Sequence, residues 1–128
     1  MGFDITLLND AQRDAMQDTE GAVLVLAGAG SGKTRVLTYR VAHLVLDKGV
    51  PDYQILAITF TNKATNEMKT RLTDMLGPNH GVWVSTIHSF CCSVLREYCE
   101  LLGYNKNFSI YDESDAMQTL KQVLKNFE

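Results

Sequence analysis

The sequence predicts an α/β fold in which helices lie on both faces of a parallel sheet, in three layers. Three apolar segments, residues 23–26, 55–58 and 82–85, have the length and residue types of buried strands. Apolar residues at helical spacing follow each segment, and strands that alternate with helices are typical of parallel sheets. A chain of 128 residues with 45% hydrophobic content suits one domain with a buried core.

Charge is distributed unevenly along the chain. The net charge is −3, but residues 31–71 carry seven basic side chains against three acidic ones. Positive charge in the middle of the chain is expected where phosphates are bound. Three cysteines without a C-x-x-C pair favour neither disulfides nor zinc, and they indicate a reducing, cytoplasmic location. We expect no membrane span and no signal peptide, and Met1-Gly2-x-x-x-Thr6 matches the short myristoylation pattern.

A first helix is predicted over residues 10–19. Asn9 is a favoured N-cap residue, and Gln12 stands three positions later, where a capping box has its reciprocal side chain. The Gln12 amide also has the donor and the acceptor needed to hydrogen-bond the edge of a nucleotide base. The spacing alone favours the cap, and both interpretations stay open at this point.

A glycine-rich turn follows the first apolar segment and ends in Lys33 and Thr34. Glycines allow positive φ in such a turn and leave room for a phosphate, and the next helix directs its first N–H groups at that phosphate. Lys33 is placed to reach the β and γ phosphates, and the Thr34 hydroxyl to coordinate Mg²⁺. The pattern therefore predicts a P-loop, although Ala27 stands where the strict motif has glycine. The predicted nucleotide-binding residues of this loop are Ala27, Gly28, Ala29, Gly30, Ser31, Gly32, Lys33 and Thr34.

A second helix is predicted to end near Asp47, before Gly49-Val50-Pro51. The strand at 55–58 then leads into a polar loop, Thr59-Phe60-Thr61-Asn62-Lys63. Ligands of open α/β sheets bind beyond the carboxyl ends of the strands. Phe60 has an aromatic face that can stack on a base while Thr61, Asn62 and Lys63 hold phosphates, as single-stranded nucleic acid requires. The alternative is a helix cap beside a core phenylalanine.

A helix is predicted over residues 63–76, with Met68 and Leu72 in its apolar stripe, and a turn over 77–81. Trp83 in the following strand is expected in the core. Polar side chains again gather where this strand ends, which indicates either a second contact to a nucleic-acid backbone or helix capping. These residues are Thr86, His88 and Ser89.

The acidic pair Asp112-Glu113 follows a short apolar run, as do the Mg²⁺-binding acids of many P-loop ATPases. The apolar spacing after Glu113 is helical, however, and acidic residues are favourable at a helix N-terminus. We therefore interpret Asp112 as the start of a helix.

Four segments together resemble the N-terminal part of the UvrD/Rep/PcrA-type superfamily 1 DNA helicases, in order and in spacing. They are L-N-D-A-Q, A-G-A-G-S-G-K-T-R, A-I-T-F-T-N-K-A-T-N-E-M and S-T-I-H-S-F. The resemblance covers nearly the whole chain and implies a RecA-like P-loop NTPase fold with an incomplete first motor domain. Residues 1–110 would form the N-terminal part of that ATP-binding domain, and residues 111–128 the start of a helical accessory insertion.

The resemblance also implies roles for individual residues. Gln12 is similar to the family's adenine-reading glutamine, and Arg35 looks like the arginine that lies near the nucleotide. Lys33 and Thr34 are the candidate catalytic residues, with ATP and Mg²⁺ as implied cofactors. Two segments are similar to those that contact single-stranded DNA, namely Thr59, Phe60, Thr61, Asn62 and Lys63, and then Thr86, His88 and Ser89. The other implied partner is the remainder of the helicase chain, including a second RecA-like domain.

The family's later Asp-Glu-x-Gln motif and its arginine fingers have no counterpart in this sequence. Because phosphoryl transfer needs Mg²⁺ ligands, a positioned water and charge neutralisation, we expect this fragment to bind ATP weakly and to hydrolyse it negligibly. The full-length parent would couple ATP hydrolysis to movement along single-stranded DNA in repair or recombination. Two alternatives remain, a small P-loop kinase and a non-catalytic, nucleotide-dependent interaction module.

Overall fold

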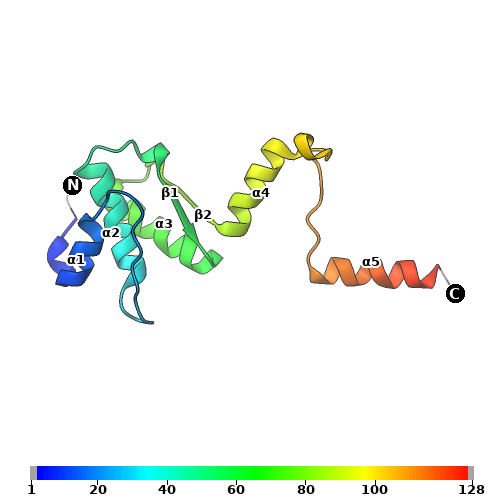
Figure 1. Cartoon of the computed structure of the whole chain (residues 1–128), viewed down its shortest axis with the longest axis horizontal. Coiled ribbons are helices and arrows are strands. Elements are labelled where there is room, and N and C mark those ends of the chain that lie inside the picture. The colour runs from blue at the N-terminus through cyan, green and yellow to red at the C-terminus, as the bar shows by residue number, and fades with distance from the viewer. Residues whose placement is uncertain (1–2, 127–128) are drawn as a thin grey trace. The chain divides into compact units, whose positions relative to one another are not determined.

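The computed structural model describes residues 3–126 (Figure 1), so Met1 and Gly2 of the myristoylation pattern lie outside the described residues. Contacts within the chain divide it into two units, Met1–Phe90 and Cys91–Glu128. The domain boundary that the sequence predicts after residue 110 stays a prediction.

The first unit contains helices and strands in alternation. Their order is η1 (Ile5–Leu7), α1 (Asp10–Gln17), α2 (Lys33–Leu46), η2 (Asp52–Gln54), β1 (Leu56–Thr59), α3 (Asn62–Leu76), β2 (Trp83–Thr86) and the start of α4 (Ile87–Tyr98). The helix starts match the capping residues that the sequence offers. Asn9 and Gln12 form the predicted capping box at α1, and the Thr61 side chain caps α3.

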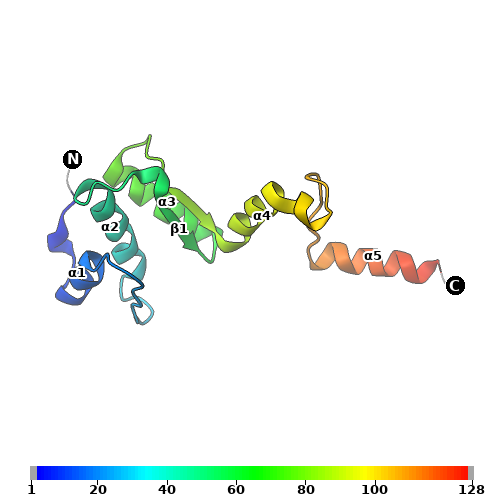
Figure 2. The same ribbon diagram turned by 45° about the horizontal axis from the view of Figure 1, so that its top comes forward.

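The sheet has two parallel strands, β1 and β2, joined by α3 as the crossover helix. Leu56 lies opposite Trp83 and Thr59 opposite Thr86, so both strands end at the same edge of the sheet. Helix α3 lies alongside β1 in both views (Figures 1 and 2), and it contacts both strands and α2. The α/β class and the parallel pairing are therefore confirmed, while a third strand and a third layer are not seen among the described residues.

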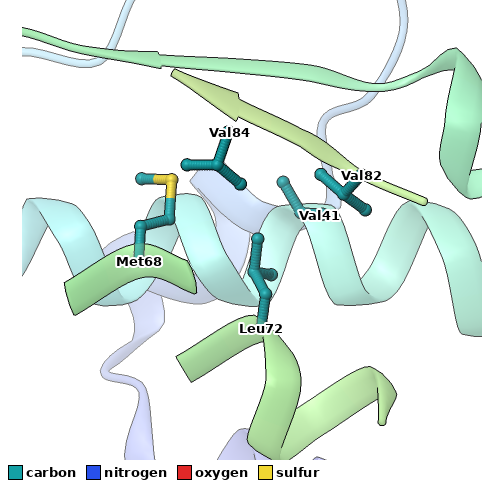
Figure 3. Close-up of a cluster of buried hydrophobic side chains, with 5 residues drawn as sticks. All are labelled: Val41, Met68, Leu72, Val82 and Val84. Atoms are coloured by element: carbon teal, nitrogen blue, oxygen red, sulfur yellow. The ribbon is translucent and has the colours of Figure 1, made fainter. Parts of the chain in front are cut away.

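The core lies between the sheet and α2 and α3 (Figure 3). Its buried side chains come from α2, α3, β2 and the residue just before β2, and they point toward one another. They are Val41, Met68, Leu72, Val82 and Val84. Met68 and Leu72 are 2% and 0% exposed, which confirms the apolar stripe predicted for this helix.

Residues 23–26 do not form a strand, contrary to the sequence prediction. Leu24 and Leu26 are 83% and 88% exposed, and no helix or strand is assigned between Asp18 and Gly32. A buried parallel strand needs a neighbour on each edge to bond its N–H and C=O groups. Within residues 3–126 the only strands are β1 and β2, and they pair with each other. The apolar run is left with no strand to join.

The prediction that Trp83 belongs to the core is wrong, because its side chain is 45% exposed. Side chains alternate between the two faces of a strand, and Val82 and Val84 take the face toward α3. Trp83 faces the other way and meets the ring of Phe90 edge-on, with 5.4 Å between the ring centroids.

The second unit is helical in the residues described. It contains the rest of α4, η3 (Cys99–Leu102) and α5 (Glu113–Lys125). The Asp112 side chain accepts a hydrogen bond from the backbone N–H of Asp115 at 2.8 Å, and the Asp115 side chain accepts one from the backbone N–H of Asp112 at 3.2 Å. This capping box confirms that Asp112 begins a helix. No helix in the described part of the chain combines the length and apolar character needed to span a membrane.

Candidate nucleotide and nucleic-acid sites

The glycine-rich turn forms a tight loop directly before α2. Gly30 and Gly32 have φ of 74° and 85°, in the left-handed region that favours glycine. Gly28 does not have positive φ, contrary to expectation. It accepts hydrogen bonds from the Ser31 hydroxyl at 2.7 Å and the Ser31 N–H at 3.4 Å. The loop is therefore closed on itself, with its outer surface in solvent.

Lys33 lies at the first position of α2 and reaches back into the loop. Its Nζ donates to the carbonyl oxygens of Gly28 at 2.7 Å and Ala27 at 3.2 Å. Gly32 is the N-cap of α2, and no side chain among the described residues caps this helix start. The first N–H groups of an α-helix attract anions. The arrangement therefore places an ammonium and a helix N-terminus beside each other, as a phosphate site requires.

Gln12 contacts the loop and the capping box at the same time. Its Oε1 accepts a hydrogen bond from the Asn9 N–H at 3.0 Å, and its Nε2 donates to the Ser31 carbonyl at 2.8 Å. A Cβ at Gly32 would lie 2.9 Å from Nε2, so a side chain there would displace the Gln12 amide, and the φ of 85° favours glycine in any case. The capping role is confirmed, and the base-reading role stays a prediction.

An open pocket of about 380 Å³ lies beside the loop. Its lining includes seven of the predicted nucleotide-binding residues, which are Gln12, Gly30, Ser31, Gly32, Lys33, Thr34 and Arg35. The Arg35 guanidinium is within 3.5 Å of the Leu7 carbonyl oxygen. Ala27, Gly28 and Ala29 are outside the lining of this pocket.

Sequence reasoning missed two residues of this pocket, Glu67 and Arg71 on α3. They form an ion pair of 2.5 Å between Arg71 Nη2 and Glu67 Oε1. An acidic and a basic residue four positions apart on a predicted helix suggest such a pair. Only the packing of α3 against α2 places the pair beside the loop.

Thr34 is the residue predicted to hold Mg²⁺ through its hydroxyl. It is half-buried in the first turn of α2, and its carbonyl accepts a hydrogen bond from the Thr38 hydroxyl at 3.1 Å. The described residues contain no group of three or more His, Cys, Asp or Glu that could hold a metal. Mg²⁺ commonly binds through one or two protein oxygens, waters and nucleotide phosphates, so a single hydroxyl beside a phosphate site fits this ion.

The loop after β1 combines an exposed ring with a helix cap. Phe60 is 79% exposed, so the alternative of a core phenylalanine is wrong. The other half of that alternative holds, because the Thr61 hydroxyl accepts a hydrogen bond from the Ala64 N–H at 3.1 Å. Asn62 and Lys63 are exposed in the first turn of α3, where a helix N-terminus also favours phosphate.

At the end of β2, Thr86 is buried and caps α4. Its Oγ1 accepts a hydrogen bond from the Ser89 N–H at 3.2 Å and donates to Ser89 Oγ at 3.0 Å. His88 is exposed. Because Thr59 and Thr86 are paired across the sheet, the two polar loops leave the sheet side by side. The structure thus brings together the two segments predicted to contact DNA.

These features define an α/β protein with a glycine-rich loop at the N-terminus of a helix. The model of the UvrD/REP helicase N-terminal domain family matches residues 8–128, and the chain belongs to this family. The resemblance found in the sequence is therefore confirmed.

Several relatives have closely similar sequences over most of this chain. The ATP-dependent DNA helicase PcrA of Bacillus subtilis (strain 168) is 50% identical over 119 residues, which are 92% of this chain. Proteins of the same name from Staphylococcus aureus (strain Mu50 / ATCC 700699) and Staphylococcus epidermidis are each 49% identical over 120 residues, or 93% of this chain. The matched part is 16% of the length of each relative.

Proposed function

We propose that this chain is the N-terminal ATP-binding part of an ATP-dependent helicase that moves along single-stranded DNA. The observation that carries the proposal is the position of Lys33, with its ammonium inside a glycine turn at the uncapped N-terminus of α2. Family membership supports it, since relatives that are about half identical in sequence are named ATP-dependent DNA helicases. We propose a cytoplasmic location as well, from the composition discussed above.

The triphosphate of ATP would lie along the glycine turn in this proposal. Lys33 would exchange its bonds to the Gly28 and Ala27 carbonyls for bonds to phosphate oxygens, which charge makes stronger. Thr34 would hold Mg²⁺ through its hydroxyl, and the ion would neutralise charge on the phosphates. Gln12 and Arg35 line the same pocket and would hold the base end of the nucleotide.

Single-stranded DNA would bind along the sheet edge where β1 and β2 end. The exposed ring of Phe60 would stack on a base, and Asn62 and Lys63 at the start of α3 would hold a phosphate. Thr86, His88 and Ser89 would contact the backbone of a neighbouring nucleotide. Because Thr59, Thr61 and Thr86 already bond within the protein, we propose that they shape the two loops around the strand of DNA.

We further propose that the chain by itself binds nucleotide without efficient turnover. Its residues hold and orient a triphosphate, but hydrolysis also needs a positioned water and groups that neutralise the γ-phosphate in the transition state. In the full helicase a second RecA-like domain would supply these groups.

The test is binding of a fluorescent ATP analogue to the chain in the presence of Mg²⁺. Lys33→Ala removes the charged donor and should weaken binding about 10- to 100-fold. Lys48→Ala is the matched control, because Lys48 is an exposed lysine just beyond the other end of α2. Circular dichroism verifies that both variants are folded.

Unchanged affinity in folded Lys33→Ala would overturn the proposed nucleotide site. Steady ATP turnover by the pure chain that disappears in Lys33→Ala would leave that site standing and overturn the proposed inactivity.

A further inference from the structure

Arg40, on α2, bonds the carbonyl end of α1. Its Nη1 donates to the Ala15 carbonyl at 2.8 Å and also to the Asp18 carbonyl. Ala15 is in the last turn of α1, and Asp18 is the C-cap residue. The Arg40 side chain is only partly exposed, so these bonds are partly shielded from water.

Helix α1 needs such a partner for two reasons. Its last four carbonyl groups have no N–H partner within the helix, and a cation near a helix C-terminus is favourable. Its own last turn contains no basic residue. With eight residues, from Asp10 to Gln17, α1 is also shorter than the roughly 12 to 15 residues at which an isolated helix becomes marginally stable in water. Arg40, on α2, therefore supplies the positively charged donor that the last turn of α1 lacks.

The N-terminal half of α1 is hydrogen-bonded to the glycine-rich turn that precedes α2, called the phosphate loop below. Gln12 Nε2 donates to the Ser31 carbonyl at 2.8 Å, and the Gln12 Oε1 bond to Asn9 fixes the amide orientation. Space around this amide is limited, because a Cβ at Gly32 would come within 2.9 Å of it. Because Gln12 lies on α1, a small rotation of α1 would move the amide relative to the Ser31 carbonyl and strain or break that bond.

We propose that Arg40 is a positioning residue that sets the Gln12 amide against the phosphate loop and thereby contributes to selection of the nucleotide base. Arg40 is outside the pocket beside the loop, so it acts through α1 and not by touching the nucleotide. The claim about base selection depends on the proposed function, in which Gln12 holds the base end of ATP. The claim about position does not depend on it.

The first test needs no nucleotide. The side-chain amide signals of Gln12 are followed by ¹H–¹⁵N NMR in Arg40→Ala, in Arg40→Lys and in Arg13→Ala. Arg13 is the matched control, since it lies on α1 and pairs with Asp10 at 2.5 Å without bridging to α2. We expect Arg40→Ala to shift and broaden the Gln12 signals, Arg40→Lys to shift them less, and Arg13→Ala to leave them in place. Unmoved Gln12 signals in folded Arg40→Lys and Arg40→Ala would overturn the proposal.

The second test compares ATP, GTP and inorganic tripolyphosphate as competitors for a fluorescent ATP analogue. A lysine ammonium can also donate to two carbonyls, but it lacks the planar geometry of the guanidinium. Both Arg40 variants should therefore lower the preference for ATP over GTP, Arg40→Lys slightly and Arg40→Ala by fivefold or more. Tripolyphosphate affinity should change less than twofold. A purely structural role for Arg40 would weaken all three ligands equally, and that result would refute base selection through Arg40.

Gln12→Ala separates this inference from the proposed function. If Gln12→Ala abolishes the preference for ATP and the Arg40 variants keep it, the role of Arg40 is refuted and the nucleotide site stands. If the unmodified chain binds ATP and GTP equally, base reading by Gln12 is refuted and base selection by Arg40 fails with it, while the NMR result still decides whether Arg40 positions α1.

Discussion

The two units of this chain are stabilised in different ways. The first has a core in which side chains of α2, α3 and the sheet bury one another. In the second, Cys99 is the one buried side chain among the residues described, and the apolar side chains of α5 are about half exposed, at Met117, Leu120, Val123 and Leu124. Both units carry apolar residues at helical spacing, so the spacing predicts a helix in each. It does not tell which helix is buried.

The largest effect should come from truncating a core side chain. Leu72 is 0% exposed and Leu120 is 52% exposed. Leu72→Ala removes buried contacts and leaves a cavity, so it should lower the free energy of unfolding of the first unit by about 2–5 kcal/mol. Leu120→Ala should change stability by no more than about 0.5 kcal/mol. Urea unfolding followed by Trp83 fluorescence and circular dichroism measures both, and equal effects would mean that α5 has a core of its own.

A second experiment asks whether an exposed ring in the first unit marks a binding site. Phe60→Ala should weaken binding of single-stranded DNA by about 1–3 kcal/mol if a base stacks on the ring. Tyr53 is the control, because it is also an exposed aromatic residue, at 71% against 79% for Phe60, but it lies in η2. Fluorescence anisotropy with an oligonucleotide at several salt concentrations gives the affinities. Equal losses for Phe60→Ala and Tyr53→Ala would argue against stacking at the loop.

Substitutions at the two capping boxes should have smaller effects on stability, but they compare one helix of each unit directly. Asn9→Ala and Asp112→Ala each remove an N-cap and should cost their helices about 1 kcal/mol. Helix α1 is also held by the buried Met16 and by Arg40, so it should stay helical, whereas α5 should fray. Amide hydrogen exchange resolves the two helices. Faster exchange in α1 than in α5 after these substitutions would contradict the distinction between the units.

The smallest effect is expected at low pH, where Asp4 becomes protonated. The Thr6 hydroxyl and the Thr6 N–H donate to Asp4 Oδ1 at 2.6 and 2.9 Å, and the hydroxyl bond, followed by the N–H bond, lowers the pKa of Asp4 below its ordinary value of 3.8. The folded state thus favours the carboxylate. Its stabilising contribution is present above pH 3.8 and is lost as the pH falls through the lowered pKa. An NMR titration should find a higher Asp4 midpoint in Thr6→Val, and an unchanged midpoint would refute this cause.

Local signals in the sequence predicted much of the fold. The capping box at Asn9, the helix start at Asp112, the stripe on α3 and the two parallel strands are confirmed, because each depends on residues near one another in the chain or on the alternation of strands with helices. The prediction of a strand at residues 23–26 was wrong for a different reason. Its residues favour a buried strand, but a strand also needs neighbours, and neighbours are not encoded in the strand itself.

In the candidate sites, too, the sequence predicted what depends on local patterns and not what depends on packing between elements. The glycine turn, Lys33 and the capping role of Gln12 are visible in the spacing of the sequence. The Glu67–Arg71 pair and the contact from Arg40 to α1 depend on how α2 packs against α3 and α1, which no local pattern specifies. Phe60 shows the limit most clearly, because an apolar residue between threonines fits a core position or an exposed one equally well.

The uncovered run at 22–27, A-V-L-V-L-A, contains no charge and no proline. Such segments pair edge to edge with copies of themselves, and they are also what chaperones retain during synthesis. The exposed run, and not the buried core, is therefore the part of the first unit at which we expect copies of this chain to associate at high concentration.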